Sequence, residues 1–165
     1  MFLSARRHFG NFLILLIPSS WFGLKRVVLR FMKIQLGRDV KVNVGVRFYG
    51  DGPIRIGDYS WISPNCIFYT AAGWGVEIGE NCDIAPEVCF VCGSHEIASS
   101  SRRAGKGKSG PIVVGNGVWV CARSTVLSAT IEDGSVVAAS SLVNKDVQRN
   151  ALVGGVPARV IRTLE

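Results

Sequence analysis

Residues 111–126 read PIVVGNGVWVCARSTV, and within this stretch Val114, Val120 and Val126 fall six residues apart. The same interval recurs through most of the chain, and the residue after each aliphatic is usually small. The recurring aliphatics are Ile56, Ile62, Ile78, Ile84, Val114, Val120, Val126, Ile131, Val137 and Val143. A hexapeptide period is typical of parallel β-helices, in which coils of short strands stack on one another. The sequence therefore predicts a β-helix whose inward aliphatics form one continuous core.

Two segments interrupt this period, and one corner is short. We expect residues 69–75 to form a turn or a small protrusion. Residues 96–111 are rich in Ser, Gly, Arg and Lys, a composition that predicts a flexible loop extruded from the helix. Val126 and Ile131 are only five residues apart, so the corner between them must be tighter than the others.

The β-helix is predicted over residues 36–147, including the loop 96–111, with a tail over residues 148–165. Pro157 marks a turn within that tail.

Residues 1–35 precede the repeats, and we predict short helices over residues 2–17 and 20–34. The apolar run at the end of the first helix is too short to span a bilayer, which takes about 20 apolar residues. In the second helix, apolar residues from Leu24 to Phe31 recur at helical spacing among basic residues. Two compatible interpretations remain open: a cap on the end of the coil stack, or a basic amphipathic patch for an anionic membrane surface.

Composition narrows the function classes. At 165 residues and 48% hydrophobic content, the chain is long enough for one domain with a sizeable core. The formal net charge of +7 favours anionic partners, but no recognised nucleic-acid-binding motif is present, so we expect no nucleic acid. The five cysteines, an odd number, fit a reducing, cytoplasmic compartment. Cys89 and Cys92 form a C-x-x-C without the second pair that a zinc site needs, so we predict no metal.

Several strings between residues 54 and 162, about two thirds of the chain, together resemble the hexapeptide-repeat acyltransferases. The strings are Ile56-Gly57-Asp58, Ile78-Gly79-Glu80-Asn81, Gly93-Ser94-His95, Val113-Val114-Gly115-Asn116-Gly117-Val118-Trp119-Val120, Ile131-Glu132-Asp133-Gly134-Ser135 and Gly154-Gly155-Val156-Pro157-Ala158-Arg159. The resemblance implies an all-β, left-handed parallel β-helix that assembles as a homotrimer, with acetyl-CoA lying between neighbouring subunits. The helical amino terminus and the loop after His95 are most similar to acetyltransferases of bacterial surface-polysaccharide assembly.

By this resemblance, His95 is the general base of acetyl transfer to a hydroxyl. Imidazole suits that task because it gains and loses a proton near neutral pH. The other histidine, His8, lies in the basic amino-terminal segment without chemical partners. Glu96 could orient the imidazole, although neighbouring strand residues point to opposite faces, and a backbone carbonyl is equally suitable. The oxyanion donor is expected to be a backbone N–H.

The resemblance places coenzyme A along the carboxy-terminal coils and the tail. It implies that Ala122 and Ala139 meet the pantetheine amides and that Trp119 lies near the cleft. Phosphate groups favour lysine and arginine partners. The cations expected to hold the phosphates are Lys145, Arg159 and Arg162.

For the acceptor, we expect Arg102 and Arg103 to contact an anionic glycan from the loop. Ser63 stands where galactoside- and maltose-type enzymes carry a sugar-binding residue. The sequence thus predicts an acetyl-CoA-dependent O-acetyltransferase of a sugar or glycan precursor, in the cytoplasm or on the inner face of the membrane. N-acetylation of an amino sugar and a non-catalytic β-helix scaffold remain as alternatives.

Overall fold

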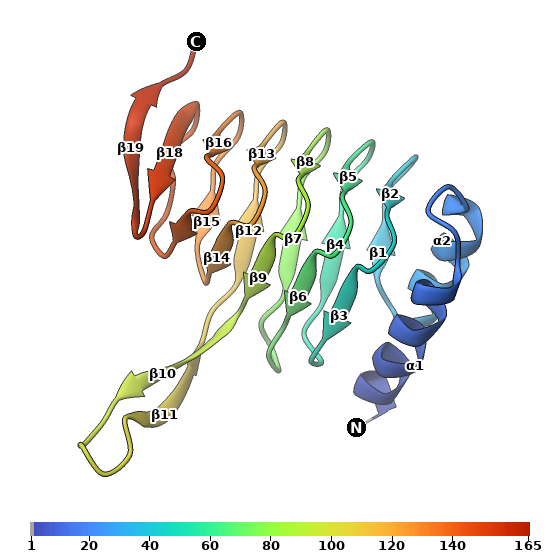
Figure 1. Ribbon diagram of the computed structural model, residues 1–165, viewed down its shortest axis with the longest axis horizontal. Coiled ribbons are helices and arrows are strands. Elements are labelled where there is room, and N and C mark those ends of the chain that lie inside the picture. The colour runs from blue at the N-terminus through green and yellow to red at the C-terminus, as the bar shows by residue number, and fades with distance from the viewer. Residues whose placement is uncertain (1) are drawn as a thin grey trace.

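The computed structural model describes residues 2–165. Two helices come first, α1 (Phe2–Leu16) and α2 (Phe22–Phe31), and strands follow to the carboxyl end (Figure 1). The chain then winds through three sheets, A, B and C, in that order on each coil. Neighbouring coils pair through parallel strands, so the repeats form the predicted parallel β-helix. We name the turns between sheets the A/B, B/C and C/A corners.

Each sheet takes one strand from each of five coils, and sheet B gains β18 and β19 at its carboxyl-terminal edge. Sheet A contains β1 (Gln35–Leu36), β4 (Ile54–Ile56), β7 (Val76–Ile78), β12 (Ile112–Val114) and β15 (Thr130–Ile131). Sheet B contains β2 (Lys41–Val42), β5 (Trp61–Ile62), β8 (Asp83–Ile84), β13 (Trp119–Val120), β16 (Val136–Val137), β18 (Ala151–Gly155) and β19 (Ala158–Thr163). Sheet C contains β3 (Arg47–Tyr49), β6 (Ile67–Tyr69), β9 (Cys89–Val91), β14 (Thr125–Leu127) and β17 (Leu142–Val143).

The core lies inside the coils. All ten aliphatics of the six-residue period are at most 3% exposed, which confirms their predicted inward direction. On sheet C the inward column begins with aromatic residues, and Phe68 stacks between Phe48 and Phe90 with ring centroids 4.9 Å away on each side. Because every coil adds one residue to each column, the core is continuous from end to end.

The small residues of the period are explained by the A/B and B/C corners. A Cβ added to Gly57 would lie 2.6 Å from the backbone carbon of Gly79 on the next coil, so that position has no room for a side chain. The third residue of these corners has positive φ, as at Asn65 (63°) and Asn81 (54°). Asparagine adopts that left-handed conformation more readily than most residues.

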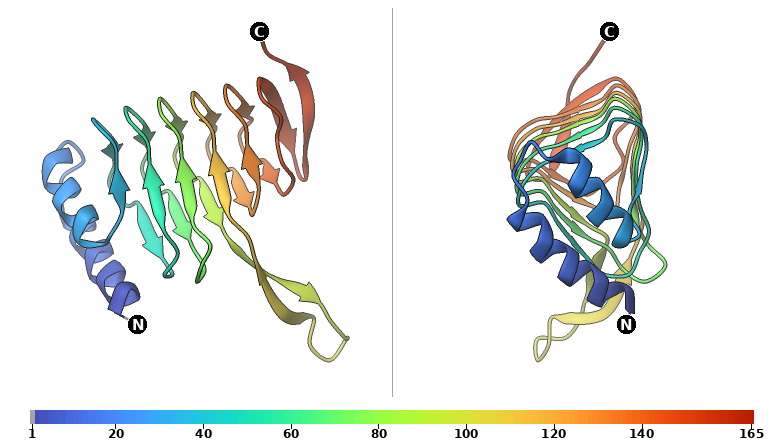
Figure 2. Two further views of the ribbon diagram at one scale, coloured as in Figure 1. Left: turned by 180° about the vertical axis from the view of Figure 1, so that it is seen from behind. Right: turned by 90° about the vertical axis from the view of Figure 1, so that its right-hand side faces the viewer.

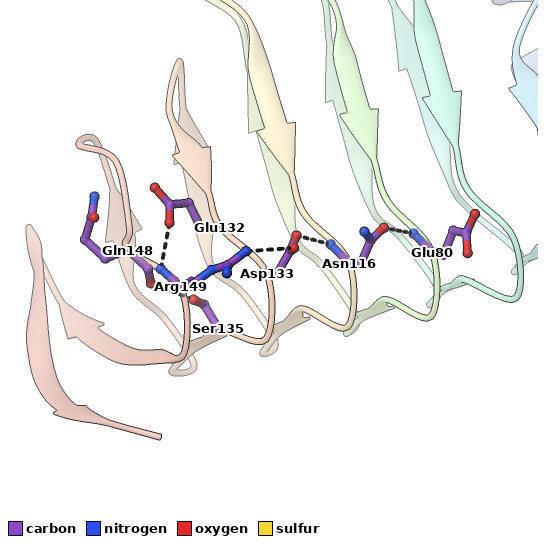
Figure 3. Close-up of polar contacts among 7 residues, drawn as sticks. All are labelled: Glu80, Asn116, Glu132, Asp133, Ser135, Gln148 and Arg149. Atoms are coloured by element: carbon purple, nitrogen blue, oxygen red, sulfur yellow. Dashed lines mark hydrogen bonds and ion pairs between the residues drawn. The ribbon is translucent and has the colours of Figure 1, made fainter. Parts of the chain in front are cut away.

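A polar ladder joins the coils at the A/B corner (Figure 3). The backbone N–H of Glu80 donates to Asn116 Oδ1 at 2.8 Å, and the backbone N–H of Asn116 donates to Asp133 Oδ1 at 2.8 Å. Asp133 also pairs with the Arg149 guanidinium at 3.3 Å. These side chains satisfy corner N–H groups, so the Gly-Asn and Glu-Asp-Gly strings of the sequence serve the fold here.

The length irregularities of the repeat gather at the C/A corner. Residues 71 and 74 close a tight turn there through reciprocal backbone hydrogen bonds. The short corner is tightened at Ser128, which has φ 43° and donates its hydroxyl to the Cys92 carbonyl at 3.0 Å.

Residues 96–111, expected to be a flexible loop, belong mainly to an antiparallel hairpin of β10 (Gly93–Ile97) and β11 (Ala104–Ser109). The loop-like composition did not reveal that the two arms pair their own backbone groups outside the coil.

The tail is also more regular than expected. Residues 151–155 form β18, which extends sheet B, and β19 folds back on it antiparallel. These strands lie at the end of the coil stack opposite the helices (Figure 1).

The two helices lie across the first coil (Figure 2). Arg7 of α1 is buried and donates to the Gly52 carbonyl at 2.8 Å and to Thr70 Oγ1 at 3.0 Å. Asn11 exchanges two hydrogen bonds with the backbone of Phe48, at 2.9 and 3.0 Å. The helical segment therefore caps this end of the coil stack, one of the two roles expected for it. Among residues 2–165, no helix has the length and apolar character needed to cross a membrane.

Candidate active site

The β10–β11 hairpin carries His95 and leaves the coil at the C/A corner. Its base is closed by a hydrogen bond from the Gly110 N–H to the Cys92 carbonyl at 2.9 Å. His95 pairs in register with Gly107, and a Cβ added to Gly107 would meet no atom within 4 Å. The imidazole is exposed, and no hydrogen bond within the described chain orients it, from Glu96 or any other residue. A glycine opposite the histidine thus leaves the ring open to a substrate.

A hollow of about 330 Å³ lies at the base of this hairpin. We call it the hairpin hollow. It is lined by Ser94, Lys108, Ser109, Gly110, Leu127, Ser128 and Asn144. Its walls come from three successive coils at the C/A corner, so the hairpin and the shortened corner at Ser128 share one site.

A second hollow, of about 210 Å³, shares the lining residue Asn144 with the first. We call it the terminal hollow. It brings Lys145 together with Arg159 of β19. Arg162 lies on the same strand opposite Leu152, outside this lining. Asp146 also lines the hollow, and its carboxylate accepts the Thr130 N–H at 2.8 Å.

The remaining donor-site candidates lie elsewhere on the chain. Trp119 lines a hollow of about 510 Å³ on sheet B, which we call the tryptophan hollow. Its other walls include Trp61, Ser63 and Asp83. Asp83 pairs in register with Trp61 on one side and with Trp119 on the other, so it occupies the strand position between the two tryptophans.

Ala122 and Ala139 occupy the second position of their B/C corners, beyond the tryptophan hollow. In the described chain their N–H groups donate no backbone hydrogen bond, whereas the flanking Cys121, Arg123, Ala138 and Ser140 all do. The two preceding coils place Pro64 and Pro86 at the same position, where proline has no N–H to donate. Ala122 and Ala139 therefore present two free donors, one coil apart.

Arg102 and Arg103 lie at the tip of the hairpin, away from all three hollows. The Arg103 guanidinium donates to the Ala98 carbonyl at 3.1 Å, and the Arg102 N–H donates to the Ser99 carbonyl at 3.1 Å. The tip projects well beyond the coils (Figure 1). Within this single chain, the structure brings these arginines close to neither Ser63 nor the terminal hollow.

The cysteines belong to the packing. All five are free thiols in residues 2–165. Burial raises the pKa of Cys66 to about 12 and that of Cys92 to about 11, so both stay protonated at neutral pH. Burial also raises the pKa of Cys82, Cys89 and Cys121. A protonated thiol is a poor nucleophile and a poor metal ligand. No cluster of three or more His, Cys, Asp or Glu suited to a metal occurs in that range.

Several known proteins are similar to this chain in sequence. No family model matches it. The chain is 33% identical over 124 residues to galactoside O-acetyltransferase of Escherichia coli (strain K12), covering 74% of the chain and 54% of that protein. It is 30% identical over 146 residues to WcaF of the same strain, which is named as a colanic acid biosynthesis acetyltransferase, covering 88% of the chain and 78% of WcaF. The chain belongs to the hexapeptide-repeat acyltransferase family.

Solved structures give the same assignment. The acyltransferase superposes on a hexapeptide-repeat acetyltransferase of Vibrio cholerae, solved with acetyl coenzyme A, with a TM-score of 0.82, 29% identity and coverage of 99% and 87% of the two chains. It matches a galactoside acetyltransferase in complex with coenzyme A with a TM-score of 0.76, 26% identity and coverage of 99% and 82%. Its fold is the left-handed parallel β-helix of this family.

Several lining residues of the acyltransferase escaped the sequence analysis. Ser128 and Asn144 were missed because the C/A corner varies in length from coil to coil, so no period aligns them. Trp61 and Asp83 could have been found, because each immediately precedes an inward aliphatic of sheet B, as Trp119 does. Residues at that position point outward and align along the sheet.

Proposed function

We propose that the protein is an acetyl-CoA-dependent O-acetyltransferase that transfers an acetyl group to a hydroxyl of a sugar or glycan precursor. His95 is its general base, and its site lies between neighbouring subunits of a homotrimer. The observation that carries the proposal is the position of His95 on a hairpin whose base lines one hollow, next to a second hollow that shares Asn144 and contains Lys145 and Arg159. Membership of an acyltransferase family supplies the chemistry for that geometry.

The two neighbouring hollows suit an extended donor with an anionic end. The hairpin hollow offers hydroxyl and amide groups and the Lys108 ammonium, with Ser94, the residue before His95, in its lining, and the terminal hollow offers two cations. A thioester in the hairpin hollow would lie near hydrogen-bonding groups, and phosphates in the terminal hollow would meet lysine and arginine side chains. We assign Arg162, on the same strand as Arg159, to the outer phosphate charge. The coenzyme A complexes of related structures support this donor.

Two parts of the expected site lie on different corners, which favours an assembly. His95 and Lys145 belong to the C/A corner, whereas Trp119, Ala122 and Ala139 belong to sheet B and the B/C corner. A neighbouring subunit can bring its B/C corner against the C/A corner of the first. The free N–H groups of Ala122 and Ala139 would then meet the pantetheine amides of a donor held mainly by the other subunit.

The reaction is direct transfer within a ternary complex. The His95 imidazole removes the proton of the acceptor hydroxyl as its oxygen attacks the thioester carbonyl. Collapse of the tetrahedral intermediate expels the coenzyme A thiolate, which takes up the proton, and leaves the acetyl ester on the acceptor. A backbone N–H stabilises the transient oxyanion. The protonated state of the buried thiols supports a mechanism without an acyl-cysteine intermediate.

The acceptor is held by Ser63, in the tryptophan hollow of one subunit, and by Arg102 and Arg103, at the hairpin tip of a neighbouring subunit. Indole faces are suited to the apolar faces of sugar rings, so Trp61 and Trp119 add support for a glycan acceptor. The names of the relatives point the same way, since one acts on galactosides and another is named for colanic acid biosynthesis. The free thiols are in keeping with a cytoplasmic enzyme.

The test is an acceptor screen with the purified protein and acetyl-CoA. Release of coenzyme A and the acetylated product, identified by mass spectrometry, would be followed with neutral, uronic and amino sugars and their nucleotide-linked forms. The proposal predicts alkali-labile acetyl esters on hydroxyl groups. Alkali-stable acetamides on amino sugars would instead establish N-acetylation, and hydrolysis or inactivity across the panel would contradict the proposal.

The shared site is tested by mixing variants. His95→Ala and Trp119→Ala each damage one half of the proposed interface. Mixed trimers, formed by refolding the two variants together, should regain part of the native activity, because some interfaces receive both native halves. Lack of recovery in mixed trimers that form normally would place His95 and Trp119 in separate roles.

A further inference from the structure

The outer face of α1 and α2 carries large apolar side chains. The inner faces already bury Ile14, Val28, Leu29 and Met32 against the first coil. The opposite faces present an outer patch whose members are 44–66% exposed. The outer patch includes Phe9, Phe12, Leu16, Trp21, Val27 and Phe31. A capping helix needs only one apolar face, so this second face is not explained by the cap.

The outer patch is continuous across both helices. Phe9, Phe12 and Leu16 follow one another along one side of α1 at intervals of three and four residues, and Val27 and Phe31 do the same on α2. The Phe9 and Phe31 rings meet edge to face with centroids 6.4 Å apart, which joins the two stripes. Contiguous exposed apolar patches of this kind mark interaction surfaces.

The two helices themselves carry positive charge and no acidic residue. The first acidic residue of the chain is Asp39, after both helices. Arg6, Arg30 and Lys33 are exposed beside the patch, and the Arg6 guanidinium lies 5.5 Å from the centre of the Phe31 ring. Arg7 and Lys25, in contrast, are buried and bonded to backbone carbonyls. Arg26 also donates to a backbone carbonyl, that of Gly37. The segment thus separates three cations bonded to backbone carbonyls from three exposed cations beside the patch.

We propose that the outer patch docks the protein on an anionic lipid bilayer. The helices lie in the interface with the outward aromatic and aliphatic side chains at the headgroup–acyl boundary, and Arg6, Arg30 and Lys33 meet lipid phosphates. Charge complementarity selects this occupant. A second copy packed face to face would bring cations of the same sign together, with no carboxylate in this segment to pair them.

The position of the helices suits a planar surface. They cover one end of the coil stack, and the β18–β19 hairpin covers the other (Figure 2). In a trimer of parallel β-helices, three outer patches would face the same direction. Binding of one outer patch would then raise the effective concentration of the other two patches at the membrane. This step alone rests on the proposed trimer.

The test is co-sedimentation of the full chain with vesicles. Vesicles of phosphatidylglycerol and phosphatidylcholine in equal parts should bind the native protein, and vesicles of phosphatidylcholine alone should bind it far less. Phe12→Ser with Leu16→Ser should lower the partition coefficient roughly tenfold or more, because two inserted side chains are lost. Arg30→Glu with Lys33→Glu should lower it by a similar factor, and only for the anionic vesicles.

Matched controls change the same properties elsewhere. Ile97→Ser with Val156→Ser removes two exposed apolar side chains away from the helices, and Arg102→Glu with Lys106→Glu changes the net charge by the same amount on the hairpin. Both controls should bind anionic vesicles within about twofold of native. Circular dichroism and acetyl-CoA calorimetry on every variant verify folding and separate this result from the donor site.

Three outcomes would overturn the docking surface. In the first, the native protein binds anionic and neutral vesicles equally poorly. In the second, the helix variants bind vesicles as the native protein does. In the third, a native assembly loses subunits when Phe12 and Leu16 are replaced by serine, and no vesicle binding occurs with either protein. That result would assign the outer patch to a second copy of the chain.

Discussion

Lys145 and Arg159 line the same hollow, although one follows the last strand of sheet C and the other belongs to the final strand of sheet B. The fold-back of β19 onto β18 produces this meeting. Two cations held near one another, with one nearby carboxylate already bonded to a backbone N–H, form a site of positive charge suited to phosphate. The relationship connects the carboxyl-terminal hairpin with the proposed donor.

Loss of either cation should weaken donor binding. Lys145→Ala and Arg159→Ala are each expected to raise the Kd for acetyl-CoA roughly 10-fold to 100-fold, since each removes a charge-assisted contact. Turnover at saturating donor should change little. Arg55→Ala is the matched control, because Arg55 lies on sheet A and pairs with Glu77. Calorimetry measures the Kd, and unchanged affinity in both site variants would remove these residues from the donor site.

The polar ladder at the A/B corner should contribute to stability. Asp133→Ala removes the acceptor for the Asn116 N–H and the partner of Arg149. We expect the free energy of unfolding to fall by about 1–2 kcal/mol. Asp83→Ala is the control, because that exposed carboxylate makes no hydrogen bond or ion pair in the described chain. Denaturant unfolding gives both values, and equal losses in the two variants would show that the ladder adds nothing specific.

Alkaline pH should destabilise the protein through its buried thiols. Burial raises the pKa of Cys66 from 9.0 to about 12, so the thiol stays protonated in the folded state after it has ionised in the unfolded one. Its contribution to stability is therefore complete below pH 9 and is lost as the pH rises toward 12. The slope reaches about 1.4 kcal/mol per pH unit for one such group.

Unfolding measured between pH 7 and pH 11 tests this linkage. Cys66→Ala should show a shallower decline of the free energy of unfolding than the native chain. Cys121→Ala, at a half-buried corner, should keep most of the native slope. A Cys66→Ala profile parallel to the native one would assign the alkaline loss to other groups.

Much of the fold follows from the period of the sequence. The inward aliphatics and the small corner residues follow local steric rules that apply on every coil. The tight short corner follows from the same rules, because one residue fewer must span it. These rules do not predict the structure of the hairpin that contains Glu96, Arg102 and Arg103. Serine, glycine and basic residues predict a loop, but pairing between the two arms of the hairpin depends on backbone partners that composition does not specify.

The candidate site is less accessible to sequence reasoning. His95 could be singled out by residue type and by the motif around it. The hollows could not be predicted from the sequence. The fold-back of the tail brings Arg159 to the hollow that Asn144 and Lys145 line, and Ser128 lies at a corner of unusual length. Trp119 lies on sheet B and His95 leaves the coil at the C/A corner, and this separation results from the closed coil, which the spacing of the two residues along the sequence does not reveal.

The most direct test of the central claim compares His95→Ala with the native protein in two measurements on the same preparations, acetyl-CoA affinity and the rate of acetyl transfer to an active acceptor. His95→Ala should bind acetyl-CoA with native affinity and transfer acetyl groups about 10²–10⁴-fold more slowly. His8→Ala, which changes an exposed histidine of α1, should behave as native in both. Native turnover by His95→Ala would contradict the proposed role of this histidine as the general base.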